Sequence, residues 1–208
     1  MTQEAAAPTG TLRAARPATF PASSPSSVAV DDHALSRALV AGDRHAFHVL
    51  VERETAQVFR ICYRILGRVD EAEDATQEAF VLAYRALGTF RGDGHPGAWL
   101  TRIATREAWR HAAKRARQRS MTAQLDASAE WLASPERGPA AAAIESDERE
   151  QVRLAVAGLP DQYREVISLR FFGDLSLREI CAATGRPEGT VKAQLHRGLK
   201  RLRATLAS

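Results

Sequence analysis

The sequence predicts an all-α fold in which two small helical domains are joined by a flexible linker. Apolar residues recur at three- and four-residue intervals through most of the 208 residues, which is the spacing of one helix face. Polar caps precede these stretches and glycines follow them, as at helix starts and stops. No stretch shows the strict alternation of a strand. Residues 119–145 lose the periodicity and gain Ser, Ala and Pro, and they form the predicted linker.

The first 30 residues are predicted to form a disordered tail. Ala, Pro, Ser and Thr dominate this segment, and it lacks the continuous apolar core of a signal peptide. No apolar run in the chain reaches the length of a membrane span, so we expect a soluble, cytoplasmic protein without membrane insertion. Cys62 and Cys181 lie far apart among apolar residues, which indicates buried free thiols in a reducing compartment.

Four helices are expected in the first domain, residues 31–118. The first is short, can be capped by Asp31 or Asp32, and ends at a glycine. The second begins at Asp43, carries apolar residues at helical spacing, and stops at Gly67.

The third and fourth helices carry most of the charge of this domain. The third opens with Asp70 and Glu73, a D-x-x-E capping signal, and runs to about Gly88. The loop FRGDGHPG then leads into a helix that starts near Pro96 and continues past Arg115. Residues 70–78 hold acids and no Lys or Arg, whereas residues 85–119 are heavily cationic. Two surfaces of opposite sign imply two kinds of partner.

The second domain, residues 146–208, is also predicted to be helical. A helix over 146–157 is ended by Gly-Leu-Pro. Ser176 and Glu179 form a capping box for a later helix, which Thr184 and Gly185 end. Between these two helices lies another, whose inward-facing residues are Tyr163, Val166, Ile167 and Leu169.

The last helix begins near Pro187 and completes a helix-turn-helix pattern. Its predicted apolar stripe consists of Val191, Leu195, Leu199 and Leu202. Its outer side is polar and basic and carries Thr190, Ala193, Gln194, Arg197, Lys200 and Arg201, while Lys192 and Arg178 of the preceding helix add to the basic excess of this segment. Such a helix suits a major groove, with early residues at base edges and later cations on phosphates. An amphipathic hairpin with solvated cations is the alternative.

A negative stripe runs along the third helix. It consists of Asp70, Asp74, Gln77, Glu78 and Val81, on a face separate from the apolar one. The stripe suits a basic partner, but it is equally typical of a solvated face with favourable helix-dipole interactions. Carboxylates along a line argue against a metal site. No nucleophile–base pair, phosphate loop or metal cluster indicates an enzyme, and no cofactor is expected.

The fourth helix combines aromatic and basic residues. Trp99 and Ile103 share a face and are predicted to belong to the core. Trp109 lies off that face among Arg106, Arg110, Lys114 and Arg115. Aromatics between cations suit single-stranded nucleic acid, because bases stack on the rings and phosphates are neutralised. A lone Trp is nevertheless more often packed than stacked on a base.

Three segments in register resemble regions two and four of bacterial RNA polymerase sigma factors of the extracytoplasmic-function (ECF) group. They are DEAEDATQEAFVLAYRAL, FRGDGHPGAWLTRIATREA and LPDQYREVISLRFFGDLSLREICAATGRPEGTVKAQLHRGLKRLR. The resemblance covers about residues 35–117 and 146–206. It implies a non-catalytic subunit that binds core RNA polymerase, at the beta-prime clamp helices and the beta flap, and directs it to promoter DNA. An anti-sigma factor is a further expected partner.

By this resemblance, the third helix binds the core polymerase through Asp70, Glu73, Asp74, Gln77 and Glu78. The loop over residues 90–97 and the helix after it would engage and melt the minus-ten element, where a base leaves the stack at a cost that a fitted site must offset. The residues expected at this element are Arg91, Arg102, Arg106, Trp109, Arg110, Lys114 and Arg115.

The helix-turn-helix would read the minus-thirty-five element as duplex. The residues expected there are Arg178, Thr190, Lys192, Ala193, Gln194, Arg197, Lys200 and Arg201. Two departures from the family pattern bear on specificity: Arg106 stands where Asn is usual, and Ala193-Gln194 where Ser-Arg is usual. Gln can pair with adenine, whereas Arg favours guanine. A free-standing helix-turn-helix regulator that acts without core polymerase is the alternative function, but it gives the acidic helix and the Trp/Arg helix no role.

Overall fold

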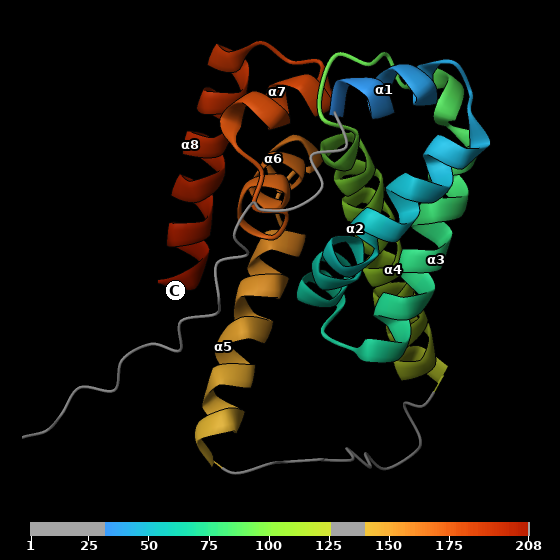
Figure 1. Ribbon diagram of the computed structural model, residues 1–208. Coiled ribbons are helices and arrows are strands. Elements are labelled where there is room, and N and C mark those ends of the chain that lie inside the picture. Colours follow the sequence, from blue (N-terminus) through green and yellow to red (C-terminus); the bar gives the residue numbers. More distant parts are fainter. Residues whose placement is uncertain (1–31, 126–139, 208) are drawn as a thin grey trace, which may run out of the picture.

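The computed structural model describes residues 32–125 and 140–207, and every regular element in these ranges is helical. Helices α1–α4 form one bundle and α5–α8 another, and the two lie side by side (Figure 1). The all-α, two-domain prediction is confirmed. The elements are α1 (Asp32–Val40), α2 (Arg44–Leu66), α3 (Val69–Arg85), the 3₁₀ turn η1 (Leu87–Thr89), α4 (Pro96–Leu125), α5 (Ala140–Ala157), α6 (Asp161–Phe171), α7 (Leu177–Thr184) and α8 (Glu188–Leu206).

Helix α2 starts and stops where the sequence indicates. The side chain of Asp43 accepts a hydrogen bond from the amide of His45 at 2.8 Å, so Asp43 is the N-cap. Gly67 ends the helix in the left-handed conformation, with φ of 75°, and its amide donates to the carbonyl of Tyr63. Trp99 and Ile103 pack against the core of this bundle as predicted.

The predicted cap of α3 is wrong. The helix starts at Val69, with Arg68 as N-cap and no side-chain capping bond. Asp70 therefore lies inside the first turn, where its carboxylate accepts from the Arg68 guanidinium at 2.9 Å. Acids in a first helical turn are favoured by the helix dipole, so the D-x-x-E pattern marks the right place for another reason. The helix ends at Arg85, and η1 carries the chain past residue 88.

Helices α4 and α5 both extend into the predicted linker range, residues 119–145. Helix α4 continues to Leu125, and α5 begins at Ala140 rather than near 146. Alanine has the highest intrinsic helix propensity, which explains why the run of alanines at 140–143 is helical. The predicted tail and residues 126–139 lie outside the described part of the chain.

The second bundle contains the predicted helix-turn-helix. Both bonds of the capping box form: the amide of Glu179 donates to Ser176 Oγ at 3.3 Å, and the amide of Ser176 donates to Glu179 Oε2 at 2.8 Å. Gly185, with φ of 68°, ends α7. The predicted inward residues Tyr163, Val166, Ile167 and Leu169 are all buried. Cys181 is only half-buried, whereas Cys62 is buried as predicted.

The two bundles share α4. Its Ala98 belongs to the second bundle's core together with Val166, Leu169 and Ile180, and Trp109 packs against residues of both cores. Polar contacts from α2 add to this interface. Arg64 donates to the carbonyl of Phe172 at 2.8 Å and to Asp174 at 2.7 Å, and Gln57 donates to the carbonyl of Gly173 at 3.2 Å.

Glu165 of α6 is the buried charge of this interface, with 14% of its side chain exposed. It accepts from Arg102 Nε of α4 at 2.8 Å and from Arg186 Nη2, in the turn before α8, at 2.5 Å. Burial by itself would raise the pKa of Glu165. The bonds and positive charges of Arg102 and Arg186 outweigh burial, and they hold the pKa below its ordinary value.

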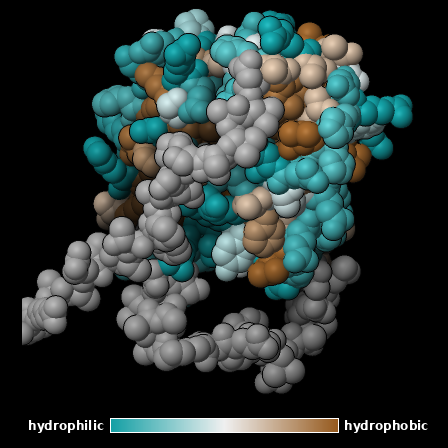
Figure 2. All heavy atoms as spheres, in the orientation of Figure 1, coloured by the Kyte–Doolittle hydropathy of each residue, from teal (hydrophilic) through white to brown (hydrophobic). Residues whose placement is uncertain are grey.

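Hydrophilic residues cover most of the surface that Figure 2 shows, with apolar patches between them. None of the helices in the described ranges combines the length and the apolarity that crossing a bilayer requires.

Replacing Ser176 by Ala removes one of the two capping-box bonds and is expected to destabilise the protein by about 1 kcal/mol. Chemical denaturation followed by circular dichroism measures this. Thr205→Ala removes a bond from an exposed hydroxyl to the carbonyl of Arg201 at the end of α8, and it serves as the control with little expected change. Equal stability of Ser176→Ala and wild type would contradict the capping role.

Replacing Glu165 by Gln should lower stability by about 1–3 kcal/mol at pH 7, because two arginines lose a buried anionic partner. Since the pKa of Glu165 is lowered on folding, its contribution is complete above the ordinary glutamate pKa of about 4.3 and is lost as pH falls through the lower folded value. Denaturation at pH 7 and at pH about 3.5 should show the gap between variant and wild type narrowing in acid. A gap that does not change with pH would contradict this. Glu150→Gln, which alters an exposed pair with Arg153 on α5, is the control.

Candidate nucleic-acid and protein interfaces

The acidic face of α3 is exposed. Asp70, Glu73, Asp74, Gln77 and Glu78 are all exposed. The opposite face of α3 carries Ala72, Ala75, Ala79 and Ala83, which are completely buried and let the helix lie against α2 and α4. Val81 and Leu82, 50% and 39% exposed, add apolar surface to the same helix. The predicted stripe is therefore a mixed acidic and apolar surface.

The carboxylates of this face differ in how they are held. Asp70 is bound by Arg68, and this bond lowers the pKa of Asp70. Among the described residues, Glu73 and Asp74 have no ion-pair partner. These two carboxylates are thus free to meet a basic partner at no cost in broken internal bonds.

Glu78 is different, because it belongs to a network with α4. It accepts from Arg110 and lies 3.2 Å from His111 Nε2, and the buried Glu107 contacts the same two residues. Donor atoms of Glu78, Glu107 and His111 lie within 4.8 Å of one another. The Arg110 guanidinium already bonds to both carboxylates, which favours an ion-pair network over a metal site.

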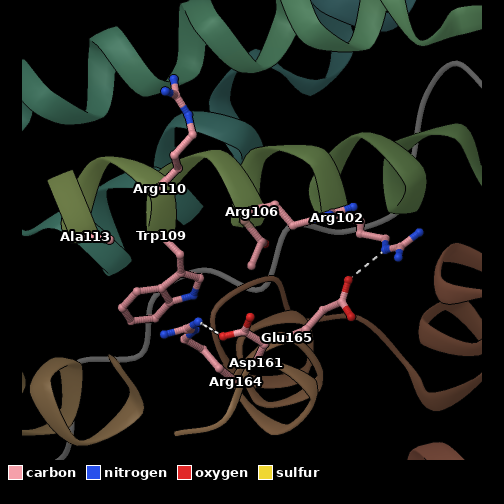
Figure 3. A pocket seen from close by; sticks show the side chains of 9 residues that line it. Arg102, Arg106, Trp109, Arg110, Ala113, Asp161, Arg164 and Glu165 are labelled. Atoms are coloured by element: carbon pink, nitrogen blue, oxygen red, sulfur yellow. Dashed lines mark hydrogen bonds and ion pairs between the residues drawn. The ribbon is translucent and has the colours of Figure 1, made fainter. Parts of the chain in front are cut away.

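Two residues expected at the minus-ten element face α6 rather than solvent (Figure 3). Arg102 donates to Glu165 and, through Nη1, to the carbonyl of Ala183 at 3.0 Å. Trp109 Nε1 donates to Ser168 Oγ at 2.9 Å, and the Arg164 guanidinium lies 5.7 Å from the centre of the Trp109 ring. In this arrangement Trp109 is packed between the bundles, which is the commoner state of a lone Trp.

The other cations expected at the minus-ten element fall into two groups. Arg110 and Arg115 are held by the first bundle; Arg115 donates to Glu71 at 2.8 Å and to the carbonyl of Leu66 at 3.2 Å. The exposed group, which has no ion-pair partner among the described residues, consists of Arg91, Arg106 and Lys114. Arg106 also lines a cleft of ≈ 330 Å³ between α4 and α6, beside Arg102 and Trp109.

The outer face of α8 is basic and exposed. Val191 and Leu202 are buried on the inner side, where Gly198 allows close approach, since a Cβ there would lie 3.0 Å from Ile167. On the outer side Lys192 pairs with Glu188 at 2.5 Å, and Arg201 lies over the ring of Tyr163. Gln194 is half-buried and accepts from Arg186. The exposed residues of this face are Thr190, Lys192, Ala193, Arg197, Lys200 and Arg201, and Arg178 of α7 is exposed as well.

Some functional residues give no signal in the sequence: Arg64 and Glu165 join the two bundles, and Arg186 bonds to Glu165 within the second bundle. Arg102 and Glu165 are 63 residues apart, and Arg64 and Asp174 are 110 residues apart. No periodic signal connects residues at such separations. In the sequence, Glu165 is only a glutamate next to Val166 of an apolar stripe, and nothing there indicates that its charge is mostly buried.

Comparison with known proteins agrees with this architecture. Residues 50–118 match the family model of Sigma-70 region 2, and residues 149–202 match Sigma-70, region 4. The chain is 35% identical over 171 residues to the ECF RNA polymerase sigma factor SigW of Bacillus subtilis (strain 168), covering 79% of this chain and 91% of that protein. It is 35% identical over 175 residues to the ECF RNA polymerase sigma-E factor of Escherichia coli (strain K12), covering 80% and 89%.

A solved structure shares the fold. CnrH, in complex with the cytosolic domain of CnrY, superposes with a TM-score of 0.53 at 24% identity, covering 85% of this chain and 97% of that one. These comparisons give no support to a free-standing regulator that acts without polymerase. With both sigma regions in order and relatives matched over most of their length, the chain belongs to the ECF RNA polymerase sigma factors, proteins that direct RNA polymerase to promoters and are in general not enzymes.

Proposed function

We propose that this sigma factor binds core polymerase and promoter DNA through two surfaces of opposite charge. The acidic face of α3 binds the beta-prime clamp helices of core RNA polymerase, α4 with the loop before it engages the minus-ten element, and α8 reads the minus-thirty-five element as duplex. The observation that carries the proposal is the separation of charge: free carboxylates on α3 and exposed cations on α8 belong to different bundles. The protein acts in the cytoplasm, and catalysis belongs to the polymerase. An anti-sigma factor is a predicted further partner.

Charge and apolar surface together support α3 as the docking helix. Opposite charges steer association and fix the register of an interface, while buried apolar area supplies most of the affinity. Glu73 and Asp74 provide unpaired charge, and Val81 and Leu82 provide apolar surface. Helical coiled coils, such as the clamp helices, commonly carry charged residues beside an apolar seam. The two surfaces therefore have complementary chemistry.

Promoter binding also requires the two bundles to separate. The two promoter elements are named for positions roughly 25 base pairs apart, on the order of 80 Å along duplex DNA. In the structure α4 packs directly on α6 and α7, and Arg102 and Trp109 are occupied there. A protein in this closed arrangement presents α8 but keeps part of its minus-ten surface covered. Binding to polymerase must offset the loss of the α4–α6 contacts.

Reversing one unpaired charge tests the docking face. Asp74→Lys should weaken binding to core polymerase by tenfold or more, about 1.4 kcal/mol, because it places a like charge against a basic partner. Fluorescence anisotropy of labelled sigma factor titrated with core enzyme measures the affinity. Glu52→Lys reverses an exposed acid on α2 and is the matched control. Unchanged affinity of Asp74→Lys would rule out this part of α3. Glu78 is unsuitable because it also holds Arg110 and His111.

A reversible cross-link tests whether the bundles must separate. A Cβ at Gly94 would lie 2.8 Å from the Cβ of Ala182, so a shift of about 1 Å allows a disulfide between cysteines at both positions. In a Cys181→Ser background, the oxidised Gly94→Cys/Ala182→Cys protein should not support promoter-dependent transcription, and reduction should restore it. Burial raises the pKa of the Cys62 thiol to about 11, so this thiol stays unreactive.

The oxidised and reduced forms carry the same substitutions and differ only in the cross-link. A difference in transcription between them is therefore an effect of the cross-link and not of the substitutions. Each single cysteine variant, treated with the same oxidant, is expected to keep its activity. If the cross-linked protein transcribes as well as the reduced one, the bundles do not need to separate.

A further inference from the structure

We infer that Arg186, in the turn of the helix-turn-helix, is a positioning residue that sets which base edge Gln194 can read. This rests on the proposed function, in which α8 enters the major groove with Gln194 at a base. Arg186 itself lies outside the predicted set of DNA-binding residues. Its side chain points into the protein and bonds to Gln194 rather than standing free in solvent.

The position of Arg186 follows from the turn. Gly185 ends α7 in the left-handed conformation, and α8 begins two residues after Arg186. From there the guanidinium lies against the second turn of α8, where Nη1 donates to Gln194 Oε1 at 3.2 Å. The guanidinium is a rigid planar fork, so fixing one nitrogen orients the others.

Glu165 holds the guanidinium of Arg186 in place. Its Oε2 accepts from Arg186 Nη2 at 2.5 Å, and the carboxylate is mostly buried on α6. Charge-assisted bonds of this kind are stronger than neutral ones. Glu165, Arg186 and Gln194 all belong to the second bundle, so this chain of bonds survives separation of the bundles. When the bundles separate, Arg102 leaves with the first bundle, and Glu165 then pairs with Arg186 alone.

The consequence lies in the chemistry of the amide. Gln194 offers one acceptor oxygen and two N–H donors. Arg186 already occupies one of the two lone pairs of this oxygen and so fixes the orientation of the amide, while the Nε2 group makes no hydrogen bond within the described residues. Bidentate recognition of adenine needs both the acceptor and a donor, whereas guanine N7 and O6, or thymine O4, need donors only. The held amide is therefore biased toward bases that present acceptors.

The two candidates just before Gln194 on α8 have no such contact from outside the helix. Lys192 pairs with Glu188 one turn earlier on the same helix, and Ala193 has no polar side-chain atom. Gln194 is a base-reading candidate in the recognition helix whose amide accepts a hydrogen bond from outside that helix. Through this contact Arg186 would alter the base preference of Gln194 without touching DNA.

The test is promoter selection by reconstituted holoenzyme from a library randomised across the minus-thirty-five element. Wild type, Arg186→Met, Gln194→Ala and the double variant are compared at one salt concentration. Arg186→Met keeps the apolar stem and removes the guanidinium. It should shift the preference at one base pair toward adenine by about fivefold or more, the low end of the value of one bidentate contact. In the Gln194→Ala background, Arg186→Met should produce no shift there.

Each other outcome contradicts a specific part of the proposal. If Gln194→Ala leaves all base preferences unchanged, Gln194 does not read a base, and both the assignment of the reader and this inference fall. If Gln194→Ala shifts one position but Arg186→Met does not, only the inference falls. If Arg186→Met shifts the same position even with Gln194→Ala, Arg186 reads DNA directly and is not a positioning residue.

A second variant guards against misfolding of Arg186→Met. Glu165→Gln leaves Arg186 in place but weakens its anchor, so it should shift the same base preference in the same direction by a smaller factor. Circular dichroism melts identify any variant whose second bundle is lost. A Glu165→Gln protein that is folded and selects the wild-type sequence would overturn the role of this anchor, and with it the fixed orientation of Arg186.

Discussion

The ion pairs of Glu165 with Arg102 and Arg186 connect the parts of this molecule that matter for its function. A carboxylate that is mostly buried is stable only if it is fully paired, because its desolvation is not otherwise offset. Two guanidiniums, one from α4 and one from the turn before α8, meet this need. The requirement to keep Glu165 paired therefore holds α4 against α6 and, separately, fixes Arg186 beside the recognition helix. One buried charge serves both the arrangement of the domains and the geometry of a proposed base reader.

The closed arrangement gives a physical picture of how such a small sigma factor can exist without the polymerase. Its interface buries Ala98 and much of Trp109, and it satisfies Arg64, Arg102 and Gln57 with partners from the other bundle. Exposing these residues without new contacts in place of the old ones would cost free energy. Polymerase and promoter DNA would have to supply equivalent contacts, so stability of the free protein and affinity for its partners are linked through one surface.

Local signals in the sequence predicted the elements, and their failures have identifiable causes. The capping box at Ser176 and the stop at Gly67 form as expected, because each depends only on residues within a few positions. Asp70 failed as a cap because α3 starts two residues earlier than that cap implies, with Arg68 in the N-cap position. The start of α5 was placed too late because a run of alanines has no periodicity to reveal a helix, although its propensity favours one. Trp109 stays a predicted contact of the minus-ten element, but its bond to Ser168 and its contact with Arg164 could not be foreseen, because these residues lie more than 50 positions away in the sequence.

The sequence by itself determined the helical class, the two-part organisation, the acidic and basic surfaces, and the family to which the chain belongs, since all of these are written in short-range patterns of charge, apolarity and capping. The tertiary structure decided which charges are free and which are paired. Among the described residues, Glu73 and Asp74 have no ion-pair partner while Glu78 is bound by α4, and Arg102 is paired while Arg106 is not. That distinction depends on contacts between residues tens of positions apart. The energies of such contacts come from burial and geometry, which no linear pattern records.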